Sequence, residues 1–111
     1  MIEKIILDYL SQALDDPVTM EIPASPPERL YVLEKVGGGR EDLVHHTMLA
    51  LSSRAPSLYE AAQMQETAMG IMFNAAALDA VSEVKLNTEY NNTDTASKDY
   101  QYEAVYEVTH Y

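Results

Sequence analysis

Three neighbouring glycines are the first residues of this sequence whose type and spacing could do chemistry. Gly37, Gly38 and Gly39 lie between two apolar segments. Arg40 and Glu41 follow. Glycine-rich loops bind phosphate when they lead into the N-terminus of a helix. Here strand-like segments flank the glycines, and the acidic residues that follow would repel a phosphate. We therefore interpret this segment as a flexible hairpin connection that contacts a neighbouring subunit, with Arg40 available for a carboxylate across the interface.

The histidines are the candidates for metal binding. His45 and His46 are adjacent on an expected strand, so their side chains point to opposite faces and cannot chelate one metal ion together. His110 is distant in the sequence and would meet either of them only through the tertiary fold. We expect hydrogen-bonded or solvated histidines, and no metal site. No nucleophile-elbow pattern and no marked pair of carboxylates is present, so the sequence predicts neither catalytic residues nor a cofactor.

A stripe of tyrosines near the C-terminus could stack on a carbohydrate or a nucleic-acid base. Tyr100, Tyr102 and Tyr106 lie on one side of an alternating segment. Stacking on nucleic acid normally comes with basic neighbours, and these are missing here. We expect the stripe to pack in the core, although tyrosine also suits a contact between subunits.

The composition limits the partners and the compartment. The 111 residues carry 7 basic and 18 acidic side chains and no cysteine, for a net charge of −11. This charge repels DNA and anionic lipid, and the lack of cysteine excludes disulfides and thiolate chemistry. No signal-peptide core and no long apolar segment is visible. We expect a soluble protein made in the cytoplasm, with residues 1–111 forming a single domain.

The elements that must position these residues begin with an amphipathic helix. Its apolar residues recur at helical spacing, and Pro17 follows its end. Short extended segments come next: residues 18–22, then 29–36 and 43–53, the last two joined by the glycines. The apolar face of this first helix is predicted to comprise Ile2, Ile5, Ile6, Tyr9, Leu10 and Ala13.

A second helix and a second hairpin complete the chain. Ser57 and Glu60 match a capping box, which predicts a helix from there to about residue 78. Its buried stripe is expected to include Ala68 and Ala76. Strands at 81–90 and 100–111 flank a polar loop. The fold class is therefore α+β, an antiparallel sheet of about four to five strands with two helices on one face, in the order α-β-β-β-α-β-β. The polar loop begins with Asn91, Asn92, Thr93 and Asp94.

The sequence resembles the small tail-completion or tail-terminator proteins of long-tailed phages and prophages of Gram-positive bacteria. The resemblance spans almost the whole chain and lies in the opening helix and in several distinctive strings. These strings are Pro26-Pro27-Glu28-Arg29-Leu30, Glu34-Lys35-Val36-Gly37-Gly38-Gly39-Arg40, Ser57-Leu58-Tyr59-Glu60-Ala61-Ala62, Lys85-Leu86-Asn87, Tyr90-Asn91-Asn92-Thr93-Asp94-Thr95 and Tyr102 to Tyr111.

This resemblance implies a structural virion protein and not an enzyme. Such subunits assemble with copies of themselves into a ring, typically a hexamer, at the head-proximal end of the tail tube. The partners implied are the tail-tube protein and the head–tail connector proteins, with DNA passing through the lumen unbound and no membrane involved. The protein would be in the host cytoplasm during assembly and then in the virion tail. Residues 36–42 and 91–98 become the candidate contacts between subunits or with partners.

Three alternatives remain open at the level of sequence. A head–tail connector component has a similar size and layout. A small regulatory binding module would act as a monomer with one partner. An enzyme would need a concave site where two carboxylates, or a histidine and an acid, converge.

Overall fold

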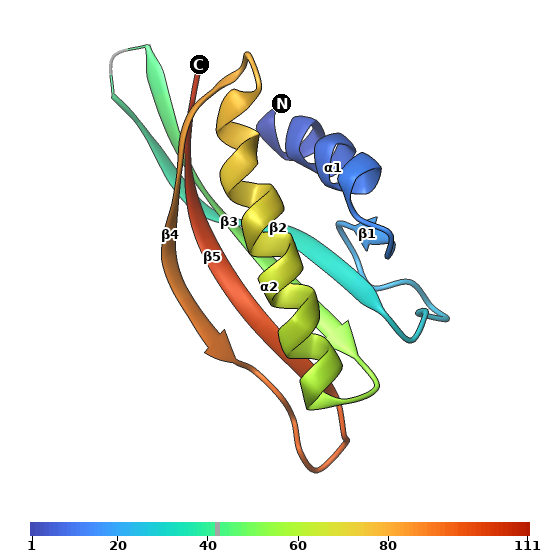
Figure 1. Cartoon of the computed structure of the whole chain (residues 1–111). Coiled ribbons are helices and arrows are strands. Elements are labelled where there is room, and N and C mark those ends of the chain that lie inside the picture. The colour runs from blue at the N-terminus through green and yellow to red at the C-terminus, as the bar shows by residue number, and fades with distance from the viewer. Residues whose placement is uncertain (42) are drawn as a thin grey trace.

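The computed structural model describes residues 1–41 and 43–111, and its arrangement confirms the predicted α+β class and element order (Figure 1). Two helices lie on one face of a five-stranded, mostly antiparallel sheet. The elements are α1 (Ile2–Ala13), β1 (Val18–Thr19), β2 (Leu30–Glu41), β3 (Val44–Ala55), α2 (Leu58–Asn74), the short 3-10 helix η1 (Ala75–Ala77), β4 (Val81–Asn91) and β5 (Tyr100–His110).

The strand order is β1-β2-β3-β5-β4, with two antiparallel hairpins side by side. One pair departs from the predicted antiparallel arrangement. Strand β1 runs parallel to β2, with Val18 opposite Tyr31 and Thr19 opposite Val32. A parallel neighbour requires the chain to return to its starting end. The proline-rich segment between β1 and β2 makes that return, so β1 is a short addition at the sheet edge.

The core lies between the sheet and its helices. Helix α2 runs along β3 and β5, and α1 packs beside it against β1 and β2. Alternate residues of β3 and β5 face the helices, as the period-two pattern predicts. On β5 these are Ala104, Tyr106 and Val108, all at most 1 % exposed. The prediction for the tyrosine stripe is confirmed in part: Tyr106 is in the core, with its ring in edge-to-face contact with Phe73. Tyr102 is only partly buried against the core, and Tyr100 is half-exposed at its edge.

The first helix buries a narrower stripe than its sequence predicts. Ile2, Ile6 and Leu10 face the core, whereas Ile5 is 37 % exposed and Ala13 is also exposed. The buried residues recur every four positions because α1 rests against the sheet along a single line. The Tyr9 hydroxyl donates to the Ile71 carbonyl at 2.8 Å and so connects α1 to α2.

The second helix begins as predicted, at a serine cap. The Ser57 hydroxyl accepts from the Glu60 amide at 3.2 Å and donates to the Glu60 carboxylate at 3.0 Å. The predicted stripe is partly wrong at the far end, because the helix tightens into η1 there. This change of pitch buries Ala75 and exposes Ala76, while Ala68 is buried as expected.

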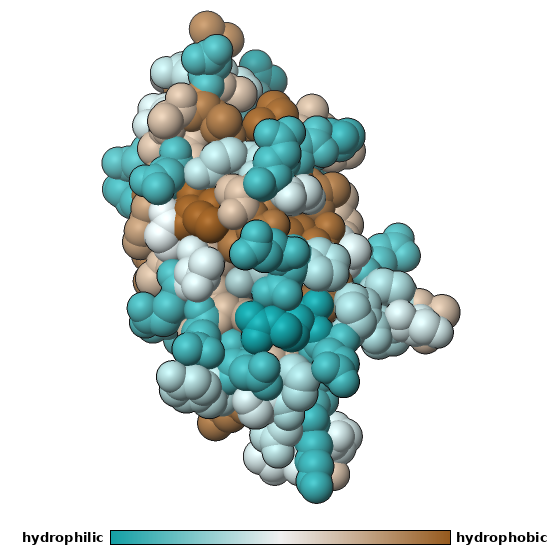
Figure 2. Space-filling view, turned by 45° about the vertical axis from the view of Figure 1, so that its right-hand side comes forward, coloured by the Kyte–Doolittle hydropathy of each residue, from teal (hydrophilic) through white to brown (hydrophobic). Residues whose placement is uncertain are grey.

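The molecule is elongated, with extents of 46 × 25 × 24 Å. Polar residues cover much of the face seen in Figure 2, and hydrophobic residues gather in its upper half. One end of the long axis is formed by the β2–β3 hairpin, and the other by the β4–β5 turn. These two ends carry the segments that the sequence predicted as contacts.

Candidate assembly surface

The glycine segment lies within a strand, which corrects the prediction of a flexible hairpin connection. Gly37, Gly38 and Gly39 pair with Met48, Thr47 and His46 of β3, and the pairing continues through Arg40 and Glu41. A bulge between Lys35 and Gly37 shifts the register by one residue. Glycine has weak strand propensity, but the partner strand supplies the hydrogen bonds that hold the segment extended. The actual turn falls after Glu41, and Asp42 lies outside the described residues.

Gly38 has a steric reason to be glycine. A Cβ atom at this position would lie 2.8 Å from the His46 carbonyl oxygen, which is closer than a carbon atom can approach without moving the backbone. At Gly39 a Cβ would meet no atom within 4 Å. The glycines therefore differ in role, and only one of them is needed for a close approach between the two strands.

Strand β2 has an open edge over most of its length. Strand β1 pairs only with Tyr31 and Val32, so residues 33–41 have a β-partner on one side alone among the described residues. An open edge presents backbone N–H and C=O groups that another chain can pair with. The opposite edge strand, β4, has two bulges, near Ser82 and Asn87, whereas the open edge of β2 has one, between Lys35 and Gly37. Bulges make an edge less suitable for pairing, so β2 has the less interrupted edge.

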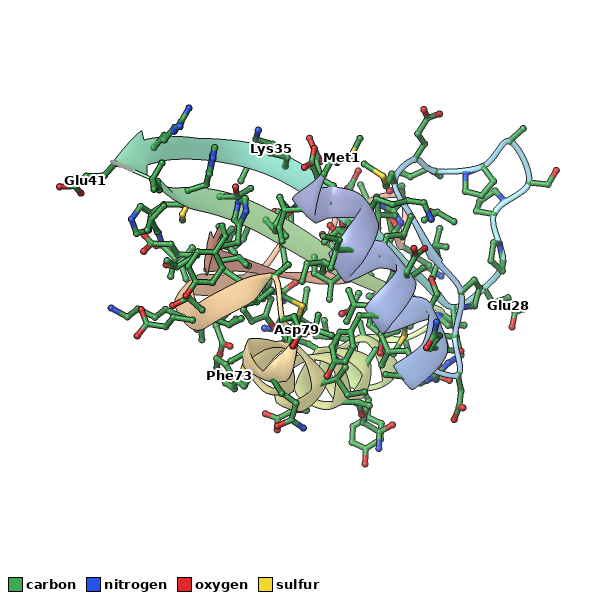
Figure 3. All side chains as sticks on the ribbon, turned by 90° about the horizontal axis from the view of Figure 1, so that it is seen from above. Met1, Glu28, Lys35, Glu41, Phe73 and Asp79 are labelled. Carbon is green, nitrogen blue, oxygen red and sulfur yellow. The ribbon has the colours of Figure 1, made fainter. Side chains whose placement is uncertain are left out.

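The far part of the β2–β3 hairpin, here called the arm (residues 36–41 and 43–46), extends beyond both helices. Glu41 lies at its end, away from α1 and α2 (Figure 3). Two apolar side chains of the arm face solvent, with Val36 53 % and Leu43 78 % exposed. Arg40 is also exposed. The arm thus combines an open backbone edge, apolar side chains and a cation, which are the components of a protein–protein contact.

The second predicted contact segment forms a compact turn. Asn91 is the last residue of β4, which lengthens the predicted strand by one residue. The Asn92 amide donates to the Gln101 carbonyl at 3.0 Å, and the Thr93 hydroxyl donates to the same carbonyl at 3.2 Å. Asp94 exchanges backbone hydrogen bonds with Asp99. Hydrogen bonds from Ser97 and from nearby backbone amides lower the pKa of the Asp94 carboxyl.

The structure does not bring the two predicted contact segments together. The arm is at the end of the sheet where His45 pairs with His110. The β4–β5 turn is at the other end, where Ala55 pairs with Tyr100. Because the two surfaces lie at opposite ends of one chain, one of them can contact the other only on a second molecule.

The histidines meet at the base of the arm. His45 and His110 occupy opposite positions on β3 and β5, and their rings stack with centroids 5.3 Å apart. The His110 Nε2 lies 2.7 Å from the Thr47 hydroxyl, and burial lowers the pKa of His110. His46 lies on the other face, 3.1 Å from the Thr109 hydroxyl. Sequence separation concealed the His45–His110 contact, which depends on the register of two strands.

No group of three potential metal ligands occurs within residues 1–41 and 43–111. None of the helices in this described part of the chain is sufficiently long and apolar to cross a membrane.

Ion pairs between charged side chains connect elements that are far apart in the sequence. Arg29 contacts Asp16 at 3.1 Å and Glu60 at 3.3 Å, and so links the β2 end of the sheet to the start of α2. Arg54 pairs with Asp99 at 2.8 Å on the face without helices.

Sequence reasoning missed one polar residue of the interior. Gln65 is a polar residue within the apolar stripe of α2, but its side chain is turned inward and the residue is 7 % exposed. The signal was present, because a lone polar residue at a buried helical position requires a polar partner. That partner is Glu89 of β4.

No model of a known protein family matches this chain, and no curated protein shows significant sequence similarity to it.

Proposed function

We propose that this chain is a structural subunit of a phage or prophage tail, a tail terminator or tail-completion protein that forms a ring at the head-proximal end of the tail tube. The observation that carries the proposal is the arm, with its open β2 edge and its exposed Leu43 and Val36. The choice of this particular assembly rests on the resemblance of the sequence to that class of proteins.

A ring of identical subunits requires two different surfaces that fit each other after a fixed rotation. The arm and the β4–β5 turn are such a pair in position, because they lie at opposite ends of a 46 Å molecule. They also differ in chemistry. The arm carries exposed apolar groups beside Arg40 and Glu41, whereas the turn is polar and carries Asp94, Lys98 and Asp99. Contact between unlike ends supports a closed ring or a continuous stack.

The net charge of −11 supports a lumen that conducts DNA without binding it. Acidic walls repel phosphate, so a duplex passes without being held at any one place. The lumen itself would be formed by several copies, and the tail-tube protein and the head–tail connector would cover its two rims.

The test is the solution mass across protein concentration, measured by light scattering and native mass spectrometry, with negative-stain imaging of any large species. We expect a closed ring of about six subunits with a central hole. Leu43→Asp should shift the population to monomers without unfolding the chain, since this side chain is 78 % exposed. The matched control is Ile22→Asp, which places the same charge at another exposed apolar residue, 51 % exposed.

Each alternative gives a different result in this experiment. A strict monomer at every concentration favours a small binding module that acts with one partner. A ring that sediments with head connectors but not with assembled tail tubes favours a connector component. Equal losses of assembly in Leu43→Asp and Ile22→Asp would show that the arm is not the contact surface.

A further inference from the structure

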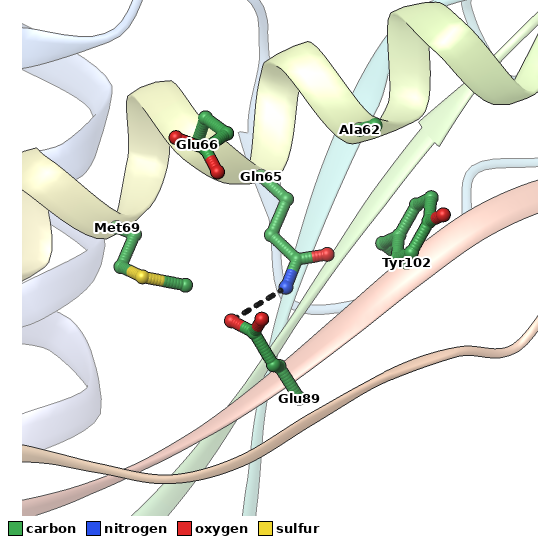
Figure 4. A pocket seen from close by; sticks show the side chains of 6 residues that line it. All are labelled: Ala62, Gln65, Glu66, Met69, Glu89 and Tyr102. Carbon is green, nitrogen blue, oxygen red and sulfur yellow. Dashed lines mark hydrogen bonds between the residues drawn. The ribbon is translucent and has the colours of Figure 1, made fainter.

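A shallow hollow lies between α2 and the second hairpin, well away from the arm. Its volume is about 210 Å³, and Figure 4 shows the side chains around it. Three of the residues in this hollow offer oxygen atoms as hydrogen-bond acceptors, and a tyrosine ring forms part of the wall. The lining residues are Ala62, Gln65, Glu66, Met69, Glu89 and Tyr102.

Gln65 is the central polar group of the hollow. Its Nε2 donates to a Glu89 carboxylate oxygen at 3.3 Å, and this contact fixes the orientation of the amide, because only the NH₂ end can donate to a carboxylate. The Oε1 atom is therefore the end of the amide that does not contact Glu89. It is buried and accepts no hydrogen bond from any residue in the described ranges. A buried acceptor without a donor is destabilising, so a ligand that donates to this oxygen atom would be favoured.

The charges around Gln65 specify the kind of donor. Glu66 and Glu89 both line the hollow, and neither forms a salt bridge with a cation of the described residues. Both carboxylates are exposed to solvent, and together they repel anions and attract cations. The Tyr102 ring adds an aromatic surface, which attracts organic cations.

We propose that this hollow binds a guanidinium or ammonium group on a short alkyl stem. Such a group has donors only, so its N–H groups can contact Glu66 and Glu89, and a small turn of the Gln65 amide brings the buried Oε1 atom within reach of one of them. A planar guanidinium can also lie against the Tyr102 ring. Its source is either an arginine or lysine side chain of another protein molecule or a small free amine. The inference depends on the chemistry of the hollow and not on the proposed assembly.

The experiment is an NMR titration of the ¹⁵N-labelled chain with ethylguanidinium chloride, with sodium chloride at matched ionic strength as the reference. The most direct readout is the Gln65 side-chain NH₂ signal, which reports the site itself. We expect saturable shifts of this signal and of the Ala62 and Met69 amides, with a Kd on the order of 1 mM for so small a probe. Shifts that match those in sodium chloride, or that do not saturate, would overturn the proposal.

Agmatine and a capped glycyl-arginyl-glycine peptide distinguish the two sources. Tighter binding of the peptide than of agmatine points to a side chain of a protein partner, because the hollow is then shaped for a cation that projects from a backbone. Tighter binding of agmatine points to a free amine. Absence of saturable binding by both probes would contradict the site.

Variants distinguish specific binding in the hollow from the general attraction of a cation to an acidic protein. Glu89→Gln and Glu66→Gln should each weaken ethylguanidinium binding by about tenfold, since each removes one charge-assisted contact. The control Glu21→Gln removes the same charge from an exposed loop and should leave binding unchanged. Gln65→Leu should abolish binding while the melting temperature holds or rises, because the buried unpaired oxygen is gone. Equal weakening in Glu21→Gln would reduce the effect to long-range electrostatics and would refute the site.

Discussion

The helix-covered part of the sheet and the arm are built from the same hairpin but are stabilised by different interactions. Under the helices, β2 and β3 bury Leu33, Leu49 and Leu51 at 2 % exposure or less. Beyond the helices, β2 carries three glycines and exposes Val36, and Leu43 is exposed just before β3 begins. The first region is held by packing, and the second by backbone hydrogen bonds to a partner strand. Stability should therefore depend on the covered part, and assembly on the arm.

The largest expected effect comes from one substitution made in both regions of strand β3 and its turn. Leu49→Ala should lower the free energy of unfolding by about 2–5 kcal/mol, because it opens a cavity in the core. Leu43→Ala should change it by less than about 0.5 kcal/mol, since that side chain is 78 % exposed. Urea unfolding of both variants measures the difference. Similar losses would mean that the arm packs as part of the core.

A second pair of variants tests the covering helix. Ala68 is 1 % exposed, and a leucine there should cost about 1–3 kcal/mol through overpacking. Ala76 lies on η1 and is exposed, so Ala76→Leu should stay within about 0.5 kcal/mol of the wild type. Melting temperatures give the comparison. Equal destabilisation by the two leucines would mean that Ala76 is also buried, and that the buried face assigned beyond Asn74 is wrong.

Within the arm, two glycines should respond with opposite signs. Gly38→Ala brings a methyl group against the His46 carbonyl and should destabilise the chain by about 1 kcal/mol. Gly39→Ala meets no atom within 4 Å, and no glycine among the described residues has a positive φ, so this variant should be stabilised by about 0.4–1 kcal/mol. Hydrogen exchange of the arm amides locates each effect. Equal behaviour of the two variants would contradict the strand register.

The smallest effect is expected at the base of the arm, where the two regions meet. Burial lowers the pKa of His110 below its ordinary value of 6.5, so the unfolded chain binds more protons between the two pKa values. The free energy of unfolding should therefore fall as the pH drops below about 6.5 toward the lowered pKa of His110. His110→Gln should flatten this dependence, whereas the control His46→Gln, on the opposite face, should retain it. An unchanged slope in His110→Gln would assign the dependence to other groups.

Local patterns predicted the elements because they depend on neighbouring residues. The alternation from Tyr100 to His110 identified β5, and the serine cap at Ser57 placed the start of α2. The same local logic was wrong for Gly37 to Glu41. Glycines are typical of turns, but these are held extended by hydrogen bonds to β3, a partner that propensity does not take into account.

The candidate surfaces were predicted in part. The sequence indicated the arm and the Asn91–Asp94 turn as exposed segments, and it gave no indication that they lie at opposite ends of the molecule. It gave no indication of a role for Gln65, because this role depends on Glu89, which is 24 positions away. The contact of His45 with His110 was missed for the same reason.

The sequence by itself determined the charge, the order of the elements and which faces of most elements are apolar, because each of these depends on composition or on short-range periodicity. The tertiary structure decided the parallel pairing of β1, the strand identity of the glycines, the stacking of two histidines and the hollow around Gln65. All of these require residues far apart in the chain to meet. Their positions follow from strand register and from the packing of helices on the sheet, which no local pattern encodes.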